Sequence, residues 1–272
     1  MIQFSTCKIN LGLSILEKRS DGFHNLQSVF YPIRTRDVLE IIESSDANED
    51  IDFSQSGLQI EGSNSSNLCV KAYHLLKKDF PELPAIKMHL HKAIPMGAGL
   101  GGGSADGAFT LKLLNEKFNL QLSTASLIKY ALELGSDCPF FIINKPCYAT
   151  GRGENLNPVT LDLSSYKIFI INPGIHVNTG WAFGQLSPNV PYINLTEAIN
   201  NPIEDWKHNI INDFEAPVVK TYPLIAEIKS QLYEQGALYA SMSGSGSTVY
   251  GIFKKESSPQ INLPESYFTK WV

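Results

Sequence analysis

The sequence contains little of what typifies secreted or membrane-embedded chains. Cysteine is scarce: Cys7, Cys69, Cys138 and Cys147 are the only four among 272 residues, and no two form a CxxC pair. This spacing argues against a zinc knuckle or a redox pair, and free thiols favour a reducing compartment. No apolar run approaches the roughly eighteen residues that a membrane span needs, and the N-terminus has no basic leader followed by an apolar block. We therefore expect a soluble, cytoplasmic protein with no membrane partner.

Clustered positive charge is also missing. The chain has 22 Lys and Arg against 27 Asp and Glu, a net charge of −5, and no Lys/Arg run longer than two residues. A surface that follows a nucleic-acid backbone needs many clustered cations. The sequence therefore predicts no nucleic-acid partner, and any anion must be bound by a few local groups.

Hydrophobic residues make up 43% of the chain, enough for a substantial core. Apolar and polar residues alternate through much of the first ninety residues, which is typical of strands. Strands are expected in CKINLGLSIL, LQSVFYPI, DVLEII, LQIEG and IKMHLHK, and apolar residues at helical spacing predict helices at about 66–80 and 123–134.

The composition changes after GRGENLNP. Beyond it we expect a strand in KIFIINPG, a helix in PLIAEIKSQLYEQG opened by Pro223 and ended by Gly236, and strands in STVYGIF and YFTKWV. The sequence thus predicts an α+β protein with two domains, residues 1–153 and 154–272.

Residues 95–109, PMGAGLGGGSADGAF, contain six glycines, five of them before Ser104. Glycine lets backbone N–H groups approach a ligand, and Ser104 is predicted to open a helix whose inner stripe begins at Ala105 and Ala108. A helix N-terminus carries unpaired N–H donors and partial positive charge, so it favours phosphate. A surface turn before an ordinary capped helix is the alternative. It would not require so many glycines, each of which adds an entropic cost, so we predict a phosphate site.

Two common phosphate loops do not fit this stretch. A P-loop needs GxxxxGK followed by Ser or Thr, and the stretch contains no lysine. Gly97, Gly99 and Gly102 match the dinucleotide pattern GxGxxG, but residues 117–127 offer no acidic side chain for a ribose.

The stretch instead resembles the second motif of the GHMP kinases, small-molecule kinases whose glycine loop wraps the phosphates of ATP. CKINLGL is similar to their first motif and SMSGSGSTVYGIF, residues 241–253, to their third. The resemblance implies a two-domain GHMP kinase fold, with an N-terminal domain like ribosomal protein S5 domain 2, a ferredoxin-like C-terminal domain and the active site between them. It also implies ATP and Mg²⁺ as cofactors. The residues expected to bind ATP are Pro95, Met96, Gly97, Ala98, Gly99, Leu100, Gly101, Gly102, Gly103 and Ser104.

The family resemblance assigns catalytic roles to Lys8 and Asp137. Alternation places Lys8 on the opposite strand face from Cys7, and a lysine in such a place is usually just solvated. Asp137 precedes Pro139, as a helix N-cap would. By resemblance, Lys8 lies beside a catalytic aspartate. A carboxylate fixed by a turn can accept the proton of an attacking hydroxyl, and a nearby lysine keeps that carboxylate ionised. We predict Asp137 as the general base and Lys8 as its electrostatic partner.

The stretch SDGFHN, residues 20–25, contains Asp21-Gly22, a strong hairpin signal. Phe23 and His24 could simply begin the second strand. However, SDGFHNLQSVF together with LGSDCPFF is similar to the GHMP kinases whose acceptor is a CDP-linked sugar alcohol of the non-mevalonate route to isoprenoids. That resemblance implies that Phe23 stacks on a cytosine ring and that His24 hydrogen-bonds its edge.

The same resemblance implies further acceptor contacts. Phe183 would be the second aromatic wall, with Trp181 as its rival, and Thr179 and Asn10 would be polar contacts to the acceptor.

Several alternatives stay open at this point. A GHMP kinase for homoserine, mevalonate or a sugar would keep the ATP loop but would not need the DGFH hairpin. A non-catalytic ATP-binding regulator would not need both Lys8 and Asp137, and a dinucleotide oxidoreductase would bind NAD. Asp106 could point away from the nucleotide or help hold Mg²⁺. The chain is expected to be a monomer or a homodimer.

Overall fold

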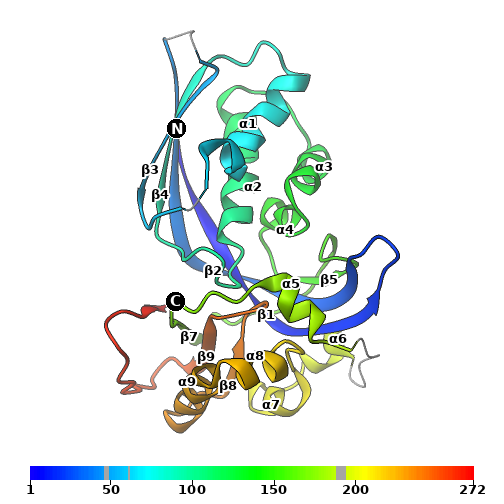
Figure 1. Cartoon of the computed structure of the whole chain (residues 1–272), viewed down its shortest axis with the longest axis vertical. Coiled ribbons are helices and arrows are strands. Elements are labelled where there is room, and N and C mark those ends of the chain that lie inside the picture. The colour runs from blue at the N-terminus through cyan, green and yellow to red at the C-terminus, as the bar shows by residue number, and fades with distance from the viewer. Residues whose placement is uncertain (46–48, 61, 188–193) are drawn as a thin grey trace. The chain divides into compact units, whose positions relative to one another are not determined.

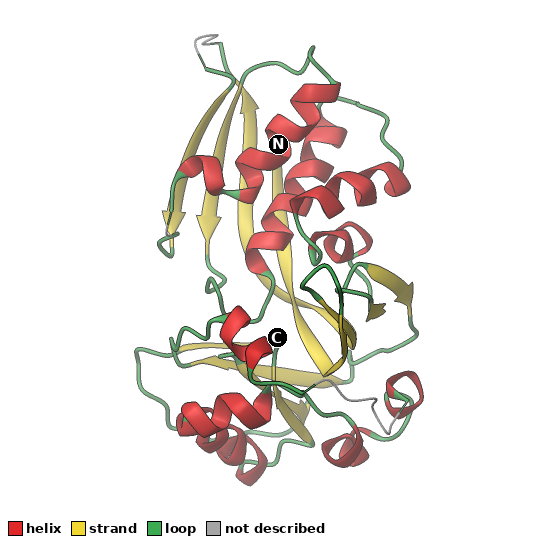
Figure 2. Cartoon of the chain, turned by 45° about the vertical axis from the view of Figure 1, so that its right-hand side comes forward, coloured by secondary structure: helices red, strands yellow, loops and turns green. Residues whose placement is uncertain are grey.

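The computed structural model describes residues 1–45, 49–60, 62–187 and 194–272, which form two compact units. Both units combine helices and strands (Figure 2), which confirms the α+β prediction. Strands β1 (Ile2–Lys18) and β2 (His24–Glu43) contribute to both units. The first unit comprises Met1–Cys7, Arg34–Met96 and Gly101–Lys145, and the second comprises Lys8–Ile33, Gly97–Leu100 and Pro146–Val272. The domain boundary at residue 153 stays a prediction.

The first unit packs helices against one face of a sheet (Figure 1). Strand β4 (Ile86–Lys92) lies between β3 (Ile51–Gly57), which runs parallel to it, and the antiparallel β2. Alternation works as expected in β4, where Met88 and Leu90 are buried. The remaining elements of this unit are η1 (Asn64–Ser66), α1 (Leu68–Asp79), α2 (Gly102–Lys117), α3 (Thr124–Leu134) and α4 (Cys138–Ile143).

Helices α1 and α3 confirm the predicted helices at 66–80 and 123–134. Each begins after a side-chain cap: Asn67 accepts a hydrogen bond from the N–H of Cys69, and Ser123 accepts one from the N–H of Ser126. Helix α3 ends at Leu134, as predicted, and Gly135 follows as its C-cap.

Two local predictions were wrong. LQIEG forms no strand at Leu58–Ile60; the strand of this region is β3, and Gly57, with φ of +81°, ends it. Helix α2 begins at Gly102 rather than at Ser104, because Gly101 takes the N-cap position in the left-handed conformation, with φ of 68°. The N-cap of α2 is therefore a glycine, which makes no side-chain hydrogen bond to the helix, and not the predicted serine.

The second unit contains a four-stranded antiparallel sheet in the order β10-β7-β9-β8. Helix α9 (Pro223–Glu234) covers it and confirms the predicted start at Pro223, while Gly236 follows its end with φ of +87°. The other elements of this unit are β5 (Cys147–Thr150), β6 (Asn155–Pro158), β7 (Tyr166–Asn172), α5 (Thr179–Gly184), α6 (Leu195–Ala198), η2 (Ile203–Asp205), α7 (Trp206–Asn209), α8 (Glu215–Thr221), β8 (Tyr239–Met242), β9 (Val249–Lys254) and β10 (Phe268–Trp271).

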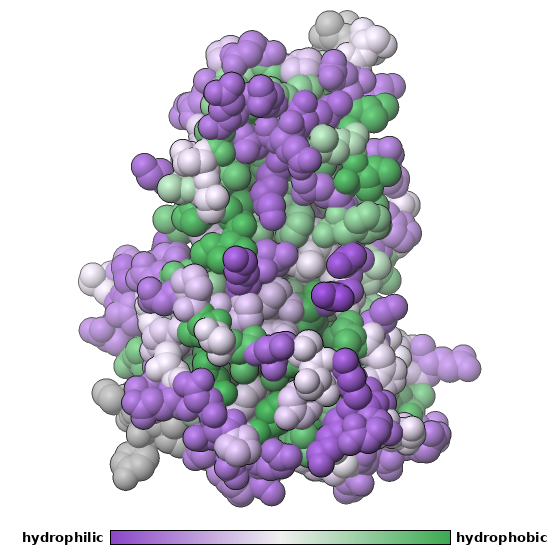
Figure 3. Space-filling view, turned by 180° about the vertical axis from the view of Figure 1, so that it is seen from behind, coloured by the Kyte–Doolittle hydropathy of each residue, from purple (hydrophilic) through white to green (hydrophobic). Residues whose placement is uncertain are grey.

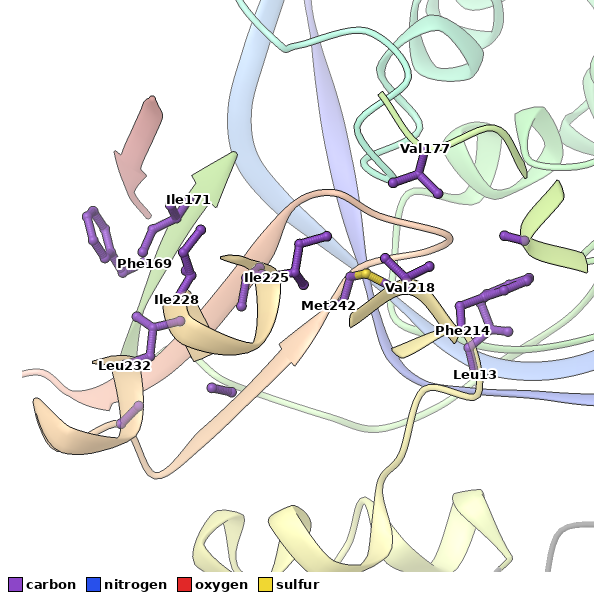
Figure 4. Packing of buried hydrophobic residues seen from close by; sticks show 14 of the residues in the cluster. Leu13, Phe169, Ile171, Val177, Phe214, Val218, Ile225, Ile228, Leu232 and Met242 are labelled. Carbon is purple, nitrogen blue, oxygen red and sulfur yellow. The ribbon is translucent and has the colours of Figure 1, made fainter. Parts of the chain in front are cut away.

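The core of the second unit lies between this sheet and its helices. Ile225, Ile228 and Leu232 of α9 extend toward Phe169 and Ile171 of β7 (Figure 4). Burying each such side chain stabilises the fold by about 1.5–3 kcal/mol. Leu13 of β1 belongs to the same cluster, so this core also fixes the strand that carries the first sequence motif.

Hydrophilic side chains are spread over the face seen in Figure 3, between smaller apolar patches. Among the described residues, no helix is both long enough and apolar enough to cross a membrane.

Candidate active site

The second unit brings together three sequence segments that carry the family motifs. The N–H of Lys8 in β1 donates to the carbonyl of Leu100 at 3.0 Å. The hydroxyl of Ser243 donates to the carbonyl of Gly99 at 2.8 Å and accepts from the N–H of Asn10 at 3.3 Å. Residues 8–10, 97–100 and 243 therefore form one hydrogen-bonded cluster.

Gly99 can only be glycine in this cluster. Its φ is +76°, and a Cβ atom added there would lie 2.0 Å from the carbonyl oxygen of Ser243. The N–H of Thr248 also donates to the carbonyl of Ala98 at 3.3 Å. The glycine stretch is thus packed directly, backbone to backbone, on the loop of the third motif.

Lys8 is held in a defined position. Its side-chain ammonium donates to Asn10 Oδ1 at 2.6 Å and lies 4.6 Å from the ring centroid of Phe30. Asn10 is fully buried, and its amide group donates in turn to the hydroxyl of Ser28 at 2.9 Å. Asn10 thus orients Lys8. Sequence reasoning missed Ser28 and Phe30, which lie in an ordinary alternating strand without a motif.

His24 and Phe183, two of the predicted acceptor residues, are in direct contact. Their ring centroids are 4.7 Å apart with an interplanar angle of 15°. Burial, with a smaller contribution from the charge of Lys18, lowers the pKa of His24, so the neutral imidazole is favoured near neutral pH. Trp181 packs edge-on against Tyr222, and Phe183 packs edge-on against Phe214, but of these two candidates it is Phe183 that stacks on His24.

Thr179 belongs to the same surface as Phe183. Both residues are on α5, four positions apart, so they share one helix face. The hydroxyl of Thr179 lies 3.0 Å from that of Ser245, in the third-motif loop. Helix α5 therefore links the aromatic contact to the three-motif cluster.

Phe23 follows the predicted hairpin turn, in which Gly22 has a φ of +85°. Phe23 is 53% exposed, so part of it is accessible to a ligand. The guanidinium carbon of Arg152 lies 5.0 Å from the ring centroid, a cation–π contact that holds the ring. Sequence reasoning missed Arg152, because GRGENLNP was interpreted only as a change in composition.

Asp137 lies in the first unit, at the N-cap of α4, but its side chain forms no capping hydrogen bond to the helix. The neighbouring Cys138 is buried, and its thiol is hydrogen-bonded to the side chain of Ser104 in the first turn of α2. Within this unit, Asp137 therefore directly precedes Cys138, whose thiol contacts Ser104 at the end of the glycine stretch. Burial raises the pKa of the Cys138 thiol to about 12, so this cysteine stays protonated and is a packing residue.

Asp106 points into the protein. It is 2% exposed and accepts hydrogen bonds from the Lys92 ammonium at 2.7 Å and from the Ser5 hydroxyl at 2.6 Å. A carboxylate so occupied is not available to Mg²⁺. Among the described residues, no group of three or more His, Cys, Asp or Glu side chains could hold a metal ion.

Family models agree with this arrangement. The GHMP kinases N terminal domain matches residues 67–145, and the GHMP kinases C terminal model matches residues 195–261. The chain belongs to the GHMP kinase family, has the two-domain fold of that family, and is a small-molecule kinase that uses ATP.

Relatives within the family are more specific. The chain is 52% identical over 256 residues to 4-diphosphocytidyl-2-C-methyl-D-erythritol kinase of Bacteroides fragilis, covering 94% of this chain and 93% of that protein. A crystal structure of 4-(cytidine 5'-diphospho)-2C-methyl-D-erythritol kinase is similar with a TM-score of 0.80 and 28% identity, over 93% of this chain and 90% of that one. Homoserine kinase from Cytophaga hutchinsonii shares the fold, with a TM-score of 0.68 at 14% identity, over 93% of this chain and 86% of that one.

Proposed function

We propose that this protein transfers the γ-phosphoryl group of ATP to a hydroxyl of 4-diphosphocytidyl-2-C-methyl-D-erythritol, forming the 2-phosphate, in the non-mevalonate route to isoprenoids. The stack of His24 on Phe183, in the same unit as the three-motif cluster, carries this proposal. The stack orients the imidazole of His24, whose edge can hydrogen-bond a pyrimidine base, and the exposed Phe23 next to it offers an aromatic surface for the base. Homoserine and mevalonate have no base to bind.

In this mechanism Asp137 accepts the proton of the attacking hydroxyl, and Lys8 offsets negative charge on the phosphoryl group as it moves. Both roles follow from the family motif. The hydrogen bond from Lys8 to Asn10 supports the role of Lys8, because it fixes the ammonium in one orientation. We expect backbone N–H groups of the glycine stretch, up to Ser104, to bind the ATP phosphates.

The acceptor is oriented by its base. Phe23 offers an exposed ring, His24 a hydrogen-bonding edge, and Phe183 a second aromatic surface. Thr179 and Asn10 are the proposed polar groups on the acceptor side, with Asn10 acting through Lys8. Interactions that orient the acceptor hydroxyl toward the phosphate increase the rate by lowering the entropic cost of reaching the transition state.

Mg²⁺ would neutralise phosphate charge when it is bound with ATP. Mg²⁺ in kinases is held by one or two carboxylates, substrate phosphates and water. The four free cysteines agree with a cytoplasmic protein, and a monomer or a homodimer remains the expected assembly.

The test is ADP release from Mg·ATP, with 4-diphosphocytidyl-2-C-methyl-D-erythritol, methylerythritol phosphate, homoserine and mevalonate compared as acceptors. We expect turnover with the CDP-linked acceptor alone, and a loss of at least about a hundredfold in Asp137→Asn, as is typical when a general base is removed. Turnover with homoserine or mevalonate instead would refute the assigned acceptor, and full activity of Asp137→Asn would refute the assigned base.

A further inference from the structure

Three buried charged side chains lie below the start of helix α2, in the first unit. The ammonium of Lys92, at the end of β4, is within 2.5 Å of Asp37 in β2 and 2.7 Å of Asp106 in α2. The exposed fractions of these side chains are 0% for Lys92, 0% for Asp37 and 3% for Asp106. The sequence analysis assigned no role to Lys92 or Asp37, and Lys92 is too deeply buried to contact a ligand on the surface.

Hydrogen bonds extend this group to the chain that leads into the glycine stretch. Asp37 Oδ1 accepts from the backbone N–H groups of Ala93 at 2.6 Å and Ile94 at 2.8 Å. On the other side, Asp106 accepts from the hydroxyl of Ser5 in β1. The network thus joins three strands to the helix, and both carboxylates have partners on the backbone, a hydroxyl or the ammonium.

Gly102, the first residue of α2, rests directly on this network. A Cβ atom added to Gly102 would lie 3.1 Å from Lys92 Nζ and 2.9 Å from Ile94 Cγ2. The first helical turn therefore packs closely on the side chains of Lys92 and Ile94.

We propose that Lys92, bridged to Asp37 and Asp106, is a positioning residue that fixes the first turn of α2 in the geometry that binds ATP phosphates. A buried ion pair contributes little net stability relative to an apolar replacement, but it can fix one arrangement in preference to others. A phosphate-binding turn benefits from such a fixed arrangement, because donors must lie within a few tenths of an ångström of their acceptors. The inference rests on the proposed nucleotide site at the N-terminus of α2.

The experiment measures ADP binding by calorimetry in the presence of Mg²⁺, and KM and kcat with the acceptor that wild type turns over. Lys92→Met alone would leave two buried carboxylates without their counter-ion, so the informative variant is Lys92→Met with Asp106→Asn. That pair of changes removes one positive and one negative charge together. Lys77→Met is the matched control, because Lys77 is also in the first unit but is paired with Asp50, at 3.8 Å, instead of with a residue of α2.

We expect the double variant to unfold cooperatively, to bind ADP about tenfold more weakly or worse, and to show a raised KM for ATP with kcat changed far less. Lys77→Met should bind ADP like wild type. A folded double variant with unchanged ADP affinity overturns the proposal, as does an equal loss in Lys77→Met.

Ser5→Ala keeps the test decisive if the double variant does not fold. It removes only the hydroxyl that donates to Asp106, and we expect ADP to bind about threefold more weakly; unchanged affinity overturns the proposal.

ADP binding does not depend on the acceptor. If wild type binds ADP but does not phosphorylate the CDP-linked acceptor, the proposed function fails while the role of Lys92 is still tested.

Discussion

Replacing Gly99 by alanine should damage the site far more than one methyl group normally would. A residue with a side chain at φ of +76° is strained by about 1–2 kcal/mol. The new Cβ would also lie 2.0 Å from the carbonyl oxygen of Ser243, so one of the two backbones must move. Overpacking of this kind adds about 1–3 kcal/mol, and loss of the hydrogen bond from Ser243 to Gly99 adds about 1 kcal/mol.

The expected destabilisation of Gly99→Ala is therefore about 3–6 kcal/mol. Gly236→Ala is the matched control, because Gly236 has a φ of +87° and no atom within 4 Å of the added Cβ. Its free energy of unfolding should fall only by the backbone strain, about 1–2 kcal/mol. Urea denaturation gives both free energies of unfolding, and the ADP release assay gives the KM for ATP. If Gly99→Ala is no less stable than Gly236→Ala and keeps its KM for ATP, the contact between the second and third motifs contributes neither to the stability of the fold nor to ATP binding.

Three further predictions concern other parts of the molecule. Burial raises the pKa of Asp106 to about 7, although Lys92 opposes the shift. Between about pH 4 and about pH 7 the native state therefore keeps a proton that the unfolded chain releases. The free energy of unfolding should fall as pH rises through this range, and it should fall less in Asp106→Asn. Urea titrations at about pH 5 and about pH 8 measure this, and equal slopes in both proteins would contradict it. Phe183→Ala should raise the KM for the CDP-linked acceptor about tenfold without changing the KM for ATP, whereas equal KM values for the acceptor in Phe183→Ala and wild type would argue against base stacking. Gly107→Ala should lower the melting temperature even though alanine favours helix by about 1 kcal/mol, because its Cβ would lie 2.9 Å from Leu68 Cβ; a higher melting temperature would show that α1 and α2 separate easily.

Sequence patterns predicted the elements better than their ends. Local signals were sufficient for four elements: apolar residues at helical spacing for α1 and α3, a proline at the start and a glycine after the end for α9, and an apolar run for β7. The start of α2 was misplaced because a left-handed glycine leaves no side-chain signature to distinguish it from its neighbouring glycines. LQIEG has the alternation of a strand, but strand pairing is decided by partners elsewhere in the chain, and β4 pairs with residues 51–57 instead.

The motifs predicted which segments would come together, because each motif is a continuous stretch of sequence. Within the second unit the three motif segments do contact one another, whereas the ligand contacts of the candidate residues stay predictions. Arg152, Ser28 and Lys92 were missed because their partners lie far away in the sequence, and a single residue in an ordinary strand or turn carries no pattern. The roles of Lys8 and Asp137 stay predictions until the variants are measured.

The contacts of Asn10 determine when the site can form during synthesis. Its N–H donates to Ser243, 233 residues later, and its carbonyl accepts from the hydroxyl of Tyr250, 240 residues later. Closing loops of this length has an entropic cost that no local contact offsets in advance, and such topologies fold slowly. A nascent chain therefore carries its first motif almost to the end of translation before the third motif can join it. Stalling or truncation of the last thirty residues should leave the glycine stretch without the loop that it packs on, and a chaperone that protects β1 in the meantime would increase the yield of active kinase.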